Sequence, residues 1–129
     1  MANLGKTLRT PLSRVRHLGA ARLGTEENWL MRVTAVALVP LTIAFVWLAL
    51  SLLNKDYNGV RAELSRPIPA LVLLLFALVG AYHMQLGMRS IILDYVRGGA
   101  REWALLANAC FAAALALACV YAVLRIGFV

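Results

Sequence analysis

The chain has 129 residues, of which 62% are hydrophobic and only 15% are charged, and its mean hydropathy is +0.77. A soluble domain carries about 25% charged residues, and one this small cannot hide so much apolar surface. A disordered chain is poor in apolar residues. The composition excludes both classes and indicates an integral membrane protein with a single domain, residues 1–129.

The net charge is +7 and the isoelectric point is about 10.3. Basic residues that flank membrane spans on the cytoplasmic side explain such a balance without nucleic acid. The sequence contains no recognisable nucleic-acid motif. We therefore expect the lipid membrane as a partner, and no nucleic acid.

Residues 1–28 form the first predicted element, a basic tail with no acidic residue before Glu26. The tail lacks the apolar stretch of a secretory signal. Its composition, rich in Arg and poor in acids, also resembles a transit peptide. We favour a cytoplasmic tail that lies at the lipid surface or docks on a partner.

Three apolar runs follow, at about residues 30–53, 68–94 and 103–125. About 20 residues suffice to span a bilayer, so the sequence predicts an all-α fold with three transmembrane helices. Pro40 is expected to kink the first helix, residues 54–67 to form a polar loop, and Gly98 and Gly99 to cap the second helix. The third run is rich in Ala, which is typical of closely packed membrane helices.

The basic residues also predict the orientation. The tail holds five Lys or Arg, and the second loop adds Arg97 and Arg101, which makes seven on one side. The other side holds four, at positions 55, 61, 66 and 125. The excess places the amino terminus in the cytoplasm and the carboxyl terminus in the periplasm.

His83 is the most informative polar residue, because it lies 15 residues into the second run, about 22 Å along the helix. A structural histidine bonded to a neighbouring helix, a proton relay and an axial haem ligand all remain open at this point. No other histidine lies in a predicted span, so a second axial ligand would come from another chain. Gly87 follows on the same helix face and can admit a flat macrocycle or another helix.

Three further polar residues are candidates for function. Asp94 and Tyr95 end the second span at the inner face, where a carboxylate beside a phenol can donate hydrogen bonds and protons to a quinone. The simpler roles are a surface charge and a member of the interfacial aromatic belt. Arg32 lies inside the first span and either snorkels to the headgroups or binds an anion such as a haem propionate, while Arg89 is expected to snorkel.

Cys110 and Cys119 are expected to be small buried apolar side chains. Nine helical residues separate them by about 13 Å along the axis, which is too far for a disulfide.

The segment His83-Met-Gln-Leu-Gly87-Met-Arg-Ser-Ile-Ile-Leu-Asp94-Tyr95-Val96-Arg97 resembles the second-helix signature of the hydrophobic membrane anchor subunit of succinate dehydrogenase, in its bacterial form. The stretch Asn28-Trp-Leu-Met-Arg32-Val-Thr-Ala35 is similar to the Arg-x-Thr-Ala pattern at the start of that family's first span. Three spans and a basic tail extend the resemblance over nearly the whole chain.

This resemblance implies that the chain packs with a second three-span anchor, of the cytochrome b556 type, around a shared haem b. It implies that His83 is one axial ligand of the haem iron, with Arg32 near the propionates. It also implies that Tyr95 hydrogen-bonds a ubiquinone carbonyl, with Asp94 beside it. Some relatives carry a histidine before Arg32, where this chain has Glu26-Glu27-Asn28.

The function implied is the membrane anchor of succinate:quinone oxidoreductase, respiratory complex II, in the bacterial inner membrane. The anchor would hold an iron–sulfur subunit and a flavoprotein subunit and would pass electrons from succinate oxidation to the quinone pool. It would have no catalytic residues of its own.

Three alternatives remain: an anchor of a quinol:fumarate reductase, a small transporter or proton-conducting protein that uses His83, Asp94 and Arg89, and a scaffold without a cofactor. The transporter is less favoured, because the first and third runs offer almost no polar residues along a path.

Overall fold

The computed structural model describes residues 23–128, which are almost entirely helical. The helices are α2 (Leu23–Leu52), α3 (Tyr57–Leu64), α4 (Pro67–Tyr95) and α5 (Gly99–Phe128). Within this described part, three helices are long and apolar enough to cross a membrane, at Glu26–Leu52, Pro67–Tyr95 and Gly99–Gly127. The three-span, all-α prediction is confirmed. Most of the predicted basic tail, residues 1–22, lies outside the described residues.

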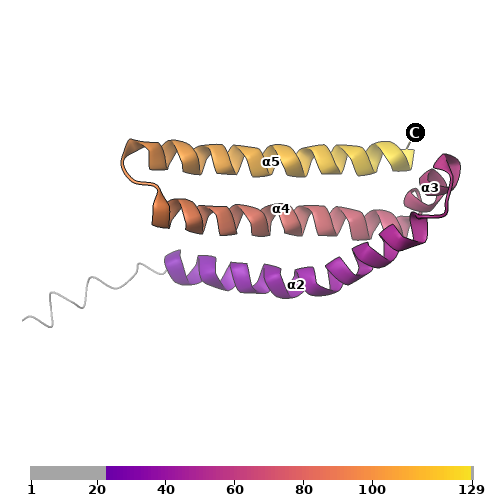
Figure 1. The fold of residues 1–129 in the computed structure, drawn as a ribbon, viewed down its shortest axis with the longest axis horizontal. Coiled ribbons are helices and arrows are strands. Elements are labelled where there is room, and N and C mark those ends of the chain that lie inside the picture. Colours follow the sequence, from indigo (N-terminus) through magenta and orange to yellow (C-terminus); the bar gives the residue numbers. More distant parts are fainter. Residues whose placement is uncertain (1–22, 129) are drawn as a thin grey trace, which may run out of the picture.

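The three long helices run side by side, with α4 between α2 and α5 (Figure 1). Helix α2 packs on α4, α4 packs on α5, and the short α3 touches α4 and α5. Few side chains are buried by this packing; among the described residues they are Leu48, Ala81, Leu86, Ile92, Asn108 and Ala112. Because apolar residues surround each helix, the remaining surface suits contact with lipid or with another membrane chain.

Helix α2 changes direction along its length, and Pro40 lies near its middle (Figure 1). Proline lacks the backbone N–H that would bond to residue 36, and its ring crowds the preceding turn, so a bend is expected there. Beyond the bend, Phe45 stacks on Phe76 of α4 with ring centroids 4.5 Å apart. The two helices therefore stay packed on both sides of Pro40.

The segment between α2 and α4 differs from the expected polar loop, because it contains α3. The Asp56 side chain caps this helix by accepting a hydrogen bond from the Gly59 N–H at 3.0 Å. Lys55 donates to Glu63 at 2.9 Å and joins the two ends of the segment. A short polar helix is stable here because its first turn is capped and its ends are tied together.

The α4–α5 connection also differs from the expectation that Gly98 and Gly99 cap α4. Helix α4 ends at Tyr95, and Val96 follows in an extended conformation. Gly98 has a φ of 70°, in the left-handed region that glycine adopts without strain, and Gly99 already begins α5. Gly98 therefore allows the chain to reverse between the helices.

Candidate functional site

His83 lies on the side of α4 that meets α2. Its Nδ1 is 2.8 Å from the hydroxyl oxygen of Thr34 on α2. The same hydroxyl is 2.8 Å from the Leu30 carbonyl oxygen and 3.1 Å from that of Met31, one turn earlier on its own helix. The imidazole is therefore held between two spans at the level of Thr34.

The second ring nitrogen of His83, Nε2, is left available. Among the described residues it has no hydrogen-bond partner, and no polar side-chain atom there is both fully buried and unpaired. The half-buried His83 therefore presents Nε2 at the surface of this chain. When the imidazole proton is on Nδ1, Nε2 carries a free lone pair and can bind a metal ion supplied from outside the chain.

Gly87, one turn from His83 on α4, faces open space. A Cβ atom built at Gly87 would meet nothing within 4 Å, whereas one at Gly80 would contact Leu38 of α2. Gly87 is therefore not needed for helix packing within the described chain. The opening beside it can accept a flat ligand or the backbone of another chain.

Arg32 is exposed and lies two residues before Thr34 on α2. Two helical residues correspond to about 3 Å of rise and more than half a turn, so Arg32 lies close to the level of His83 but on another side of α2. Within the described residues Arg32 has no carboxylate in ion-pair contact. Its guanidinium is thus free to bind an anion outside this chain.

Arg89 differs from the expectation that it snorkels alone. Its guanidinium lies 2.6 Å from the Glu27 carboxylate at the start of α2. Glu27 also lines a polar cavity of about 340 Å³ between α2 and α4, together with Ser90. The pair joins the start of α2 to the second half of α4, about 9 Å along α4 from His83.

Asp94 and Tyr95 form the last residues of α4, and both are exposed. Tyr95 keeps 82% of its surface accessible, and it lies 12 residues beyond His83, about 18 Å along the helix. The structure therefore does not bring these residues together with His83. It leaves them at the helix end, where another subunit or a lipid-soluble ligand can reach them.

A further polar contact was not anticipated from the sequence. Asn108 of α5 is buried, with 8% of its surface accessible, and its amide donates to the Gln85 main-chain carbonyl of α4 at 2.9 Å. The sequence signal was a lone amide in the Ala-rich run, since an amide there needs a partner on a neighbouring helix.

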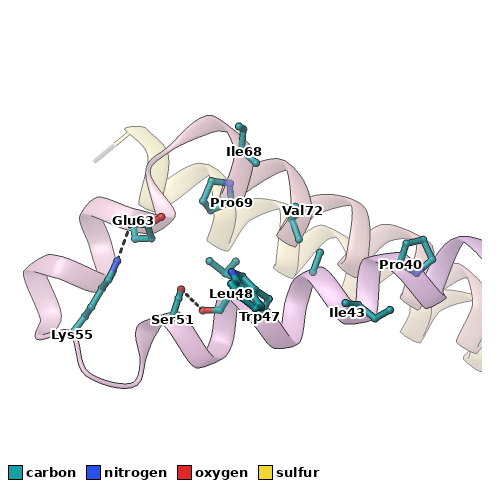
Figure 2. Close-up of a pocket in the computed structure, with 11 residues that line it drawn as sticks. Pro40, Ile43, Trp47, Leu48, Ser51, Lys55, Glu63, Ile68, Pro69 and Val72 are labelled. Carbon is teal, nitrogen blue, oxygen red and sulfur yellow. Dashed lines mark hydrogen bonds and ion pairs between the residues drawn. The ribbon is translucent and has the colours of Figure 1, made fainter.

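A cavity of about 720 Å³ lies at the other end of α4, between its first turns and the second half of α2. Apolar side chains including Trp47 and Leu48 line it, and the Lys55–Glu63 ion pair lies at its edge (Figure 2). Neither His83 nor Tyr95 lines this cavity, so it is separate from the candidate site.

The two cysteines carry free thiols, as expected. The expectation that they are buried is wrong for this chain alone, because Cys110 is exposed and Cys119 is half-buried.

Comparison with known proteins identifies the family of this chain. The family model described as the succinate dehydrogenase/fumarate reductase transmembrane subunit matches residues 6–123. A relative from Paracoccus denitrificans named succinate dehydrogenase hydrophobic membrane anchor subunit is 38% identical over 118 residues, 92% of each chain. A Rickettsia bellii protein of the same name is 33% identical over 88 residues, 68% of this chain and 70% of its own. No solved structure matches the chain. The chain is a multi-pass membrane protein that belongs to the succinate dehydrogenase/fumarate reductase transmembrane subunit family.

Proposed function

We propose that this chain anchors a succinate:quinone oxidoreductase in the bacterial inner membrane and contributes to a haem b site and a ubiquinone site. The relatives are named for succinate dehydrogenase, which favours succinate oxidation over fumarate reduction as the direction of the complex. The partners we propose are a second membrane anchor, an iron–sulfur subunit and a flavoprotein subunit. The chain itself would carry no catalytic residue.

The observation that carries the haem assignment is the imidazole of His83, held on one nitrogen and free on the other. Neutral imidazole nitrogen is a ligand of haem iron, and the open space beside Gly87 suits a flat macrocycle. No other histidine lies in the three spans, so His83 would be the single histidine ligand that this chain gives to the iron. The second ligand would then come from the partner anchor.

A haem bound there would supply a one-electron redox centre inside the membrane. Arg32 would contribute a fixed positive charge for a propionate at nearly the same depth. The attraction between the Arg32 guanidinium and a propionate would be stronger there than in water, because the effective dielectric constant is lower.

Tyr95 and Asp94 would serve the quinone at the inner end of α4. The Tyr95 hydroxyl would donate a hydrogen bond to a quinone carbonyl oxygen, which gains negative charge as the quinone is reduced. The Asp94 carboxyl beside it would pass protons from the aqueous face. The exposure of both side chains supports a site completed by other subunits.

The orientation follows from the same arrangement. Tyr95 would lie at the cytoplasmic face if seven basic residues hold the amino tail and the α4–α5 turn inside. The iron–sulfur subunit would dock on that face. The predicted tail and the three spans would then form one anchor domain.

Replacing His83 by Leu tests the proposal. In the purified complex, His83→Leu removes one strong-field ligand, so we expect haem to be lost or to change spin state in optical and electron paramagnetic resonance spectra. Succinate oxidation by a soluble dye, which accepts electrons before the membrane, should persist and shows that the catalytic subunits are intact. An unaltered bis-histidine spectrum at full haem occupancy would leave His83 as a structural residue that joins α2 and α4.

A further inference from the structure

The contact between Thr34 and His83 decides which ring nitrogen is free. A threonine hydroxyl has one hydrogen, and two main-chain carbonyl oxygens lie within 3.1 Å of Thr34 Oγ1. When the hydroxyl donates to one of them, its oxygen can only accept from His83. The proton of the neutral imidazole is then on Nδ1, and Nε2 carries the lone pair.

The opposite arrangement would disable the site. If the hydroxyl donated to Nδ1, the imidazole would carry its proton on Nε2, and that nitrogen could not bind iron while neutral. The back-bond from Thr34 to its own helix is a common geometry for threonine in membrane helices, and it occupies the single hydroxyl hydrogen. A Thr34 hydroxyl that keeps its hydrogen on the α2 backbone requires the Nδ1–H form of His83.

We propose that Thr34 is a positioning residue: its hydroxyl, fixed by the α2 backbone, accepts from His83 Nδ1 and holds the imidazole with Nε2 ready to ligate iron. This inference rests on the proposed haem site. Partners that accept the second N–H of a ligating histidine fix its tautomer and ring orientation and raise its basicity, and their loss typically costs about 10- to 100-fold in metal affinity.

The test compares three variants of the purified complex. Thr34→Val keeps the shape of the side chain and removes the hydroxyl acceptor, whereas Thr34→Ser keeps that acceptor. Thr42→Val is the control, because it makes the same change at an exposed threonine on the same helix. Measurements are the rate of haem transfer to an apo-haem scavenger, the reduction potential and the electron paramagnetic resonance g values. Dye-coupled succinate oxidation reports assembly.

With Thr34→Val we expect haem affinity to fall about 10- to 100-fold and the reduction potential to rise, because a less basic imidazole stabilises oxidised iron less. Thr34→Ser and Thr42→Val should match the unmodified complex. If Thr34→Val does not assemble, Thr34→Ala removes the hydroxyl without adding an apolar branch and carries the same expectation.

Unchanged haem transfer, potential and g values in the assembled Thr34→Val or Thr34→Ala complex would overturn the positioning role. The His83→Leu spectrum separates that failure from a failure of the proposed function. If His83→Leu loses the bis-histidine signal while the Thr34 variants keep it, only the role of Thr34 falls. If His83→Leu also keeps it, the haem assignment falls and the role of Thr34 with it.

Discussion

The buried amide of Asn108 makes a direct prediction about how α4 and α5 are held together. Its single interhelical hydrogen bond, 2.9 Å to the Gln85 carbonyl, lies at a site where only 8% of the residue is accessible. Asn108→Leu removes the donor and keeps the number and branching of the side-chain heavy atoms. The Gln85 carbonyl retains its ordinary helix partner four residues later, so no main-chain group is left unpaired.

The expected loss of stability follows from the removal of this one hydrogen bond. Side-chain hydrogen bonds between membrane helices contribute about 0.6 kcal/mol on average and at most about 1.7 kcal/mol, since the separated helices also find partners. We expect Asn108→Leu to lower the free energy of unfolding by about 1 kcal/mol, roughly a fivefold change in the folding equilibrium. Asn108→Asp should cost more at neutral pH, because it sets a carboxylate oxygen against the carbonyl oxygen.

Equilibrium unfolding of the purified protein in mixed micelles with increasing sodium dodecyl sulfate measures these differences through tryptophan fluorescence. The hydrogen bond is supported as a net contributor to stability if the free energy of unfolding decreases in the order unmodified protein, Asn108→Leu, Asn108→Asp. An Asn108→Leu protein as stable as the unmodified one would show that apolar packing of α5 on α4 is sufficient.

Three other predictions concern the quinone, the orientation and the α3 segment. Tyr95→Phe should weaken quinone binding by about 0.5–1.5 kcal/mol and leave dye-coupled succinate oxidation intact; unchanged quinone kinetics would remove Tyr95 from the site. A reporter active only outside the cytoplasm should fail when inserted at Gly98 and work when fused after the last residue, and the reverse pattern would invert the orientation. The hydrogen bond from Lys55, together with the nearby positive charges, lowers the pKa of Glu63 below its usual value. The stabilising contact is thus complete above the ordinary carboxyl range and is lost as the pH falls through the lowered pKa. The hydrogen-exchange protection factors of residues 57–64, which correct for the intrinsic pH dependence of exchange, should fall there, and Glu63→Gln should abolish this dependence.

The spans were predictable because hydropathy over 20 or more residues outweighs every local preference in a membrane chain. The start of α2 was not, because the polar turn Leu23–Glu27 continues the helix beyond the apolar run, with no change in hydropathy to mark the boundary. Helix α3 was missed for a related reason: it is short and polar, and its stability comes from the Asp56 cap and the Lys55–Glu63 contact.

The candidate site was also predictable only in part. His83 stands out in sequence because an ionisable side chain is rare inside a span, and Gly87, Asp94 and Tyr95 stand out through the family-like pattern that they form with it. The contact of His83 with Thr34 depends on how α2 and α4 are rotated against one another, which no pattern within either helix reveals. Whether these residues bind haem and quinone stays a prediction.

The row of helices in Figure 1 has a consequence for how the chain is made. The order of the spans along the sequence, α2, α4 and α5, is also their order in space, so each packs on the one synthesised before it. A span leaving the translocon would find its neighbour already in the bilayer, and no later helix has to be inserted between earlier ones. The Thr34–His83 contact can form as soon as α4 enters, before α5 has been translated. Biogenesis of this chain therefore needs only successive additions at one edge.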